Sequence, residues 1–375
     1  MWILNRAGAV PALALTFLAA AASAQMPAPK AMVHSTFIAD CLPKPQGNEL
    51  CRLPVVFEAD DAEKHLAGAD LAYWIEGTTF NVAARAQADE AQLTGTVAEG
   101  MTPLSTRRPM WGASYRVTDL DHAIIELGLK GNDKAKVVYR GPAAPPAPPM
   151  NETLKGQLDK VEVPSAALGA ARTVSVYTPP GKAPAGGWPV VYAGSSDQIG
   201  ALAAITDALI ERHEVRPVAI VALGEGLDSE YLRRKDPNGY QRRDMFVHRE
   251  ALPLIEKRYR LSAKPADRLL FGIGPAADWA IDTVLRDPAM GGAGVAAFSP
   301  PGLVEFPFRN KALHLRLQAG WYEPPYIKGA RSTCNLAGAS FAKCDLDLTA
   351  SGHAPLIWQA EWAKVLKAVF PAGRR

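Results

Sequence analysis

The sequence predicts two domains of different class: an all-β domain, and after it an α/β domain whose mostly parallel, doubly wound sheet has helices on both faces. Three observations support this prediction. Residues 53–140 read as short strands separated by Asp, Gly, Asn and Pro. A proline-rich segment follows at 141–155. Beyond it, apolar strands alternate with amphipathic helices, which is typical of an open, mostly parallel sheet.

The strand periodicity of the all-β segment is clearest in "WGASYRV". Trp111, Ala113, Tyr115 and Val117 alternate with small or polar residues, as in a strand that is buried on one face. Several such strands in a row, without helices between them, favour two antiparallel sheets packed as a β-sandwich. We expect this domain to cover residues 25–140.

The boundary between the two domains is predicted from proline. Residues 140–150 contain five prolines in eleven positions. Because proline has no N–H for a sheet ladder and stiffens an extended chain, we expect a linker at 141–155. The α/β domain then occupies residues 156–375. Within it, "RPVAIVAL" (216–223) is a nearly continuous apolar run, as expected of a strand that helices cover on both sides.

The charge balance argues against nucleic acid as a partner. Lys and Arg number 41 against 38 Asp and Glu, which gives a formal net charge of +3. No basic run is interleaved with aromatic residues. We therefore expect no nucleic-acid binding.

The N-terminus has the pattern of a secretory signal. A basic residue precedes a short apolar stretch that ends in the small-x-small tripeptide Ala22-Ser23-Ala24. The predicted signal is residues 1–24, cleaved after Ala24, and the product is then periplasmic or secreted and spans no membrane. The alternative is a retained membrane anchor, but the apolar run is short for a span and Pro11 interrupts it.

Four cysteines form two pairs of identical spacing, Cys41 with Cys51 and Cys334 with Cys344. An exported chain meets an oxidising compartment, so we expect disulfides. Three connectivities are possible, and local pairing is favoured because each pair lies within one predicted domain. Each local loop would stabilise the fold by roughly 3 kcal/mol in the chain-entropy model. The competing interpretation is a zinc site, but no close Cys or His pair with metal-ligand spacing accompanies these cysteines, and we expect no metal.

Several segments match one family in order and spacing. They are "EALPLIEKRYR", "RLLFGIGPAA", "AAFSPPG", "AGWYE" and "SGHAPLIW", together with "MTPLSTRRPMWGASYRVTDLDHAIIEL" in the all-β domain. The chain thereby resembles the enterochelin (siderophore) esterases and feruloyl-esterase-like proteins, a branch of the α/β-hydrolases. The resemblance implies an α/β-hydrolase fold preceded by an immunoglobulin-like β-sandwich, a small-molecule ligand and no cofactor.

The resemblance also places three catalytic positions in the chain order nucleophile, acid, histidine. They fall on Gly274 of "GIGPA", Glu323 of "GWYE" and His353 of "SGHAP". Asp345 and Asp347 stay open as alternative acids, since both also precede His353.

Two of the residues in the nucleophile motif are unfit for acyl transfer. Gly274 offers no hydroxyl that a histidine could deprotonate. It still permits the strained turn that this position requires. The oxyanion hole of this fold uses the backbone N–H of the next residue, but here that residue is Pro275, which has none. The motif therefore predicts that the fold is retained and that ester hydrolysis is lost.

Two routes to residual activity remain open from the sequence. Ser195 or Ser196 of "YAGSSD" would be a replacement nucleophile, although loop serines usually bond to local backbone. Alternatively, His353 with its carboxylate would activate a water in the space of the missing serine.

Binding candidates flank the expected cleft, at loops or element ends where open α/β sheets bind ligands. They are Asp197, Trp321, Tyr322 and Trp358. The segment 232–244 adds five basic residues on an expected loop, which is a solvated surface or the mouth of an anion site.

The sequence thus predicts an exported, enterochelin-esterase-like protein that has lost catalysis and binds an ester-, sugar- or siderophore-like ligand or a protein partner. The alternatives are an active carboxylic-ester hydrolase that uses His353, and a purely structural envelope protein.

Overall fold

The structure, a computed structural model, describes residues 38–373 except positions 46, 88, 225, 227, 305–312 and 341 and the side chains of 228 and 229. The predicted signal, residues 1–24, lies outside the described residues. From Met32 onward the chain forms one compact unit. The domain boundaries derived from the sequence therefore stay a prediction.

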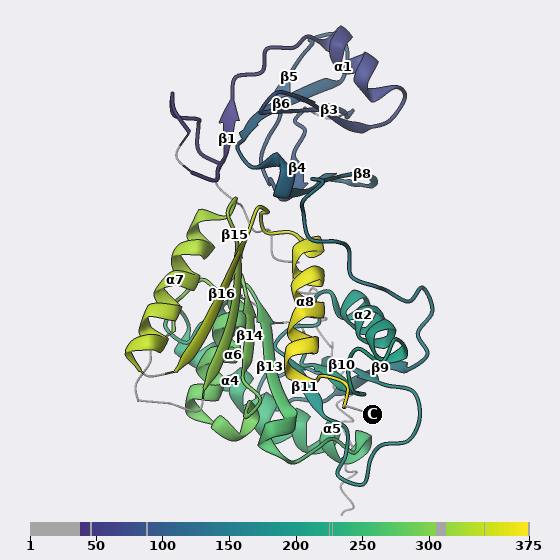
Figure 1. Ribbon diagram of the computed structural model, residues 1–375, viewed down its shortest axis with the longest axis vertical. Helices are drawn as coiled ribbons and strands as arrows, with labels where there is room; N and C mark the ends of the chain where they lie inside the picture. Colours follow the sequence, from purple (N-terminus) through teal and green to yellow (C-terminus); the bar gives the residue numbers. More distant parts are fainter. Residues whose placement is uncertain are drawn as a thin grey trace, which may run out of the picture. The chain divides into compact units, whose positions relative to one another are not determined.

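Two antiparallel sheets form the N-terminal part of the described chain (Figure 1). The first has the order β1–β6–β3–β2, with β5 also paired to β6, and the second has the order β4–β7–β8. Phe80 and Tyr115, which face each other in register, share one buried cluster with Ile125 and Leu127 of the second sheet. The strands are β1 (Leu50–Leu53), β2 (Leu71–Glu76), β3 (Thr79–Arg85), β4 (Leu93–Gly95), β5 (Thr102–Pro103), β6 (Met110–Val117), β7 (Ile124–Leu129) and β8 (Asn132–Arg140).

One helix in this part was not expected from the sequence. Residues 53–59, "LPVVFEA", lie in the segment expected to be strands, but β1 ends at Leu53 and helix α1 (Ala59–Leu66) begins at Ala59. Its buried residues Ala59, Ala62 and Leu66 have helical spacing, and acidic residues occupy the first turn, where they complement the helix dipole. The prediction of strands without helices is therefore wrong at this point.

An eight-stranded sheet forms the α/β part, in the order β16–β15–β14–β13–β11–β12–β10–β9. Strands β9 and β10 and the pair β10/β12 are antiparallel, and all other neighbours are parallel. This confirms the mostly parallel sheet. Its strands are β9 (Gln157–Val163), β10 (Arg172–Thr178), β11 (Val190–Ala193), β12 (Ala219–Ala222), β13 (Arg268–Ile273), β14 (Val295–Phe298), β15 (His314–Gly320) and β16 (Lys343–Thr349).

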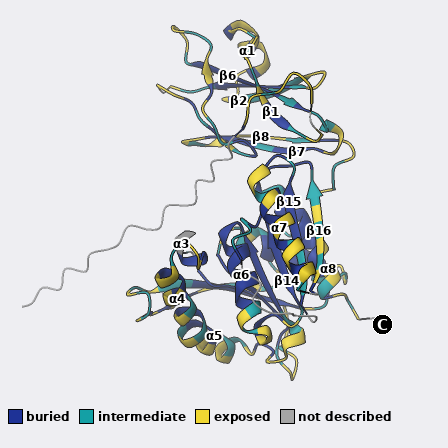
Figure 2. Ribbon diagram, turned by 90° about the vertical axis from the view of Figure 1, so that its left-hand side faces the viewer, coloured by how far each residue is buried: buried dark blue, intermediate teal, exposed yellow. Residues whose placement is uncertain are grey.

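Helices cover both faces of this sheet, so its strands are buried on two sides (Figure 2). One core cluster joins the sheet to α2 (Ile199–Glu211) and α8 (Pro355–Val369). The opposite cluster joins it to α5 (Leu252–Tyr259), α6 (Pro275–Arg286) and α7 (Pro324–Ala339). Two-sided burial explains the continuous apolar runs of the central strands.

The segment between β12 and β13 is more helical than the sequence suggested. After α3 (Asp228–Tyr231), α4 (Pro237–Met245) continues through a π-helical turn, η2 (Phe246–Ala251), into α5. The Asp236 carboxylate caps α4 by accepting from the Gly239 N–H at 2.8 Å, and Pro237 suits the first turn. Part of the expected basic loop is therefore helix. Short 3₁₀ turns complete the chain: η1 (Leu120–His122), η3 (Pro265–Asp267) and η4 (Pro288–Met290).

Both local disulfides are confirmed. Cys41 pairs with Cys51 at a Cα–Cα distance of 4.9 Å, and Cys334 pairs with Cys344 at 5.5 Å. The second bridge ties α7 to the edge strand β16. None of the helices in the described part of the chain is long and apolar enough to cross a bilayer.

Candidate functional site

Strand β13 turns into helix α6 through the single residue Gly274. Its backbone has φ 57° and ψ −130°, its N–H donates to the Phe298 carbonyl at 2.9 Å, and its carbonyl accepts from the Ala277 N–H at 2.9 Å. A left-handed φ with extended ψ suits glycine and strains any other residue. The approach of helix to strand is also close, because a Cβ on Gly272 would lie 2.0 Å from the Ala276 carbonyl oxygen.

Pro275 is the first residue of α6. Proline is well suited to this position, whose N–H would have no partner within the helix. The same residue supplies no N–H toward the space above Gly274. Ala276 and Ala277 are completely buried, so the first turn of α6 is packed directly on the sheet.

Glu323 and His353 lie together at the ends of two neighbouring strands. Glu323 follows β15 and His353 follows β16, and parallel strands bring their carboxyl ends to the same edge. The His353 Nδ1 atom lies 2.8 Å from the Glu323 Oε2 atom, and the two side chains are 3% and 0% exposed. The carboxylate can only accept from Nδ1–H, which fixes the orientation of the imidazole.

The second oxygen of Glu323 is held as firmly as the first. Glu323 Oε1 accepts from the Ser299 hydroxyl at 2.7 Å and from the Gly320 N–H at 2.6 Å. The Ser299 oxygen in turn accepts from the Trp358 indole N–H at 3.2 Å. Ser299 was not among the predicted site residues. The motif "AAFSPPG" contains it, but only the structure shows that it faces the carboxylate.

Two aromatic rings enclose the imidazole of His353. Tyr326 stacks on it with ring centroids 4.6 Å apart, and Trp358 meets it edge-on at 4.7 Å. The ring is thereby fixed by packing as well as by the hydrogen bond to Glu323.

The alternative acids have other partners. Asp345 Oδ2 lies 2.6 Å from His314 Nε2, and Asp347 Oδ2 accepts from Lys364 Nζ at 3.0 Å. Glu323 is thus the carboxylate that pairs with His353.

The predicted binding residues separate into buried and exposed ones. Tyr322 and Trp358 are 1% and 7% exposed and belong to core clusters. Asp197 is exposed, Trp321 is half-buried, and Ser195 is buried. Of the four candidates, Asp197 and Trp321 are thus the ones whose side chains solvent reaches.

Arg243 corrects the interpretation of the basic segment. It belongs to the five basic residues expected on a solvated loop, yet it is fully buried. Its guanidinium donates to the carbonyl oxygens of Gly194 and Gly224, which follow β11 and β12, and lies 4.1 Å from the centroid of the Tyr231 ring. Here a cation links the ends of two sheet strands.

Asp278 is a further buried carboxyl group. It lies one helical turn beyond Gly274, beside the sharp strand-to-helix turn, or elbow, that this glycine forms. Its side chain accepts from the backbone N–H groups of Gly302 at 3.2 Å and Leu303 at 2.7 Å. Burial raises the pKa of Asp278 to about 6. The carboxyl group thereby fixes the loop that follows β14.

One family model and several solved structures are similar to this chain. Residues 165–343 match the model of an esterase family, described as "Putative esterase". No curated protein matches the sequence. Ferric enterobactin esterase from Salmonella typhimurium is similar in fold, with a TM-score of 0.60 at 14% identity over 80% of this chain and 96% of that chain.

Enterobactin esterase from Shigella flexneri, solved in the presence of enterobactin, gives a TM-score of 0.60 at 14% identity over 84% of this chain and 99% of that chain. Enterochelin esterase from the same organism gives a TM-score of 0.58 at 13% identity, over 80% of this chain and 95% of that chain. The α/β part of this chain therefore has a fold similar to that of these esterases, and most of it falls within the match to the esterase family model.

Replacing Gly274 by alanine tests the strain at the elbow. We expect Gly274→Ala to lower the free energy of unfolding by about 1–3 kcal/mol, because alanine is strained at a left-handed φ. Urea denaturation measures this change. Gly200→Ala is the control, since Gly200 lies in helix α2 and a Cβ there meets nothing within 4 Å. Equal stability of the Gly274→Ala variant and the natural protein would contradict the strained turn.

Asp278 predicts a pH dependence of stability. Its pKa is higher in the folded protein than in the unfolded chain, so its contribution to stability is complete below about pH 4 and is lost as the pH rises through about 6. The loss amounts to at most about 3 kcal/mol. Asp278→Asn cannot titrate, so the difference in unfolding free energy between variant and natural protein should change over this window. A difference that stays constant from pH 4 to 7 would refute the assignment.

Proposed function

We propose that this protein is an exported, non-hydrolytic member of the enterochelin-esterase-like branch that binds a ligand. The single observation that carries the proposal is Gly274 at the elbow, followed by Pro275. The turn at Gly274 and the buried Glu323–His353 pair support the family assignment, and glycine at residue 274 offers no hydroxyl for attack on an ester.

Two chemical groups that ester hydrolysis would use are absent at residues 274 and 275. Glycine has no hydroxyl, so no acyl-enzyme intermediate can form at residue 274. Proline has no N–H, so one donor to the oxyanion of a tetrahedral intermediate is lost. Removal of one such donor typically costs about 2.7–4 kcal/mol of transition-state stabilisation. Either change alone would slow ester hydrolysis, and together they argue for a role in binding.

The proposed ligand is an ester-, sugar- or siderophore-like small molecule, or else a protein partner. Structural similarity to an enterobactin esterase that was solved in the presence of enterobactin supports a small molecule of this kind. The exposed Asp197 and the half-buried Trp321 offer a carboxylate and an aromatic ring to such a ligand.

Export is part of the same proposal. The predicted signal at residues 1–24 supports it, and so do the two disulfides, since disulfides persist in oxidising compartments. The protein would then act in the periplasm or outside the cell.

A second candidate function is a slow carboxylic-ester hydrolase. The observation that favours it is the 2.8 Å contact between His353 and Glu323, the arrangement that orients a general base. In this alternative His353 deprotonates a water, or another nucleophile, in place of the missing serine. The absent N–H at Pro275 acts against such a reaction as well.

Hydrolysis of a short aryl ester distinguishes the two candidates. For the binding protein we expect the natural protein and His353→Ala to give the same rate, close to that of buffer. His122→Ala is the matched control, because His122 is a well-exposed histidine that pairs with Asp119. A rate well above buffer that falls in His353→Ala and persists in His122→Ala would show that the site is catalytic, and the binding proposal would then be wrong.

A further inference from the structure

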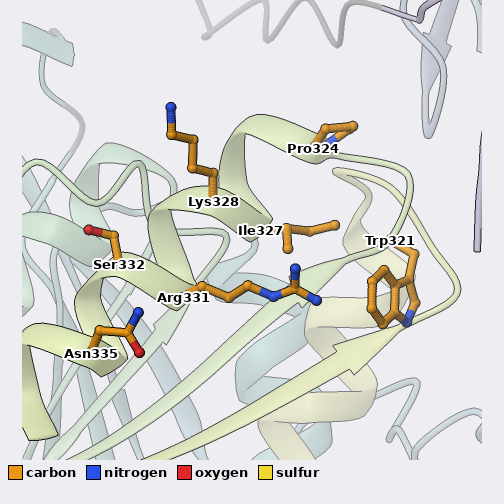
Figure 3. Close-up of a pocket in the computed structure, with 7 residues that line it drawn as sticks. All are labelled: Trp321, Pro324, Ile327, Lys328, Arg331, Ser332 and Asn335. Atoms are coloured by element: carbon orange, nitrogen blue, oxygen red, sulfur yellow. The ribbon is translucent and has the colours of Figure 1, made fainter. Parts of the chain in front are cut away.

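A separate pocket of about 520 Å³ lies on the outer side of helix α7 (Figure 3). Its volume lies within the range of small-molecule sites. The lining residues come from α7 and from the end of β15, and none of Gly274, Glu323 and His353 is among them: Trp321, Pro324, Ile327, Lys328, Arg331, Ser332 and Asn335.

The pocket is cationic. Lys328 and Arg331 are both exposed, and none of the described residues that line the pocket is acidic. Neither cation forms an ion pair within the part of the chain that the structure describes. Two positive charges one turn apart on a helix, without a compensating carboxylate, attract an anionic group.

One side of the pocket is aromatic. Ile327 and Arg331 point toward the ring of Trp321 (Figure 3), and the Arg331 guanidinium lies 5.4 Å from its centroid. Trp321 is half-buried, so part of its surface is open to a ligand. A flat ring could pack on this surface while its anionic substituent meets Arg331 and Lys328. Ser332 and Asn335 add hydrogen-bonding groups one and two turns along the helix from Lys328.

Helix α7 is held rigidly behind this pocket. Gly329 packs so closely on the loop after β14 that a Cβ would lie 2.2 Å from the Pro300 carbonyl oxygen. The Cys334–Cys344 disulfide ties the helix to β16 beside Arg331 and Asn335. Because the helix is fixed on its inner side, its outer residues are presented in one arrangement, which reduces the entropy lost on binding.

We propose that this pocket is a binding site for a small organic anion that carries an aromatic or sugar ring. The anionic group pairs with Lys328 and Arg331, the ring packs on Trp321, and hydroxyl groups of the ligand meet Ser332 and Asn335. The pocket shares Trp321 with the ligand site proposed above, but Glu323 and His353 do not line it, so the proposal stands whether or not the chain hydrolyses esters.

Isothermal titration calorimetry on the full chain tests the site with four probes. Two are anions, 4-hydroxybenzoate and glucuronate, and two are their neutral counterparts, 4-hydroxybenzyl alcohol and glucose. We expect at least one anion to bind at or below about 1 mM and its neutral counterpart to bind about tenfold more weakly or not at all. Whether the benzoate or the sugar acid binds better identifies the kind of ring. Binding should weaken as salt is added.

Variants assign the binding to this pocket. Lys328→Gln combined with Arg331→Gln should weaken anion binding about tenfold or more, because two charge-assisted contacts are lost. Lys257→Gln is the matched control, an exposed helical lysine on α5. Trp321→Ala should also weaken binding, and Trp321→Phe should retain most of it. No binding of either anion at about 1 mM, equal binding of anions and neutral probes, or unchanged binding in the double variant would each overturn the proposal.

Discussion

The hydrogen bond between Glu323 and His353 is the interaction on which the carboxyl edge of the sheet depends. Three strand ends meet at it, because Ser299 follows β14, Glu323 follows β15 and His353 follows β16. Both side chains of the pair are buried, and leaving a buried hydrogen-bonding group without its partner typically costs about 1–3 kcal/mol. The pair therefore has a structural role whether or not the site is catalytic.

The N-terminal sheets contact the same carboxyl edge of the α/β sheet. The Ile124 N–H at the start of β7 donates to the Ala350 carbonyl at 2.8 Å, just before the loop that bears His353. Gly352 in that loop lies so close to the Thr96 backbone that a Cβ would be 2.7 Å from its carbonyl oxygen. Tyr322, the neighbour of Glu323, is buried in the core that the N-terminal sheets share. The histidine is thus positioned by both halves of the described chain.

The sequence predicted those features that depend on local patterns. Strand–helix alternation predicted the α/β sheet, and the position of each cysteine pair within one predicted domain favoured the local disulfides. The catalytic roles of Gly274, Glu323 and His353 were assigned from the family resemblance and stay a prediction. Features that depend on contacts between distant segments were missed. Ser299 and Asp278 look like ordinary polar residues until the fold brings Glu323 and the N–H groups of Gly302 and Leu303 to them. The sequence suggested that Arg243 lies at the surface, because the backbone carbonyls that accept its hydrogen bonds leave no trace in the sequence.

The central claim is that only the attacking hydroxyl and one oxyanion donor separate this site from a working esterase. Restoring these two chemical groups tests the claim most directly. Aryl-ester hydrolysis should be compared for Gly274→Ser and for Gly274→Ser with Pro275→Gln. The account predicts little activity from the serine alone and about a hundredfold or more from the double variant, since the restored N–H stabilises the oxyanion. Equal rates for the two variants would contradict it, because Pro275 would then not limit the chemistry of the site.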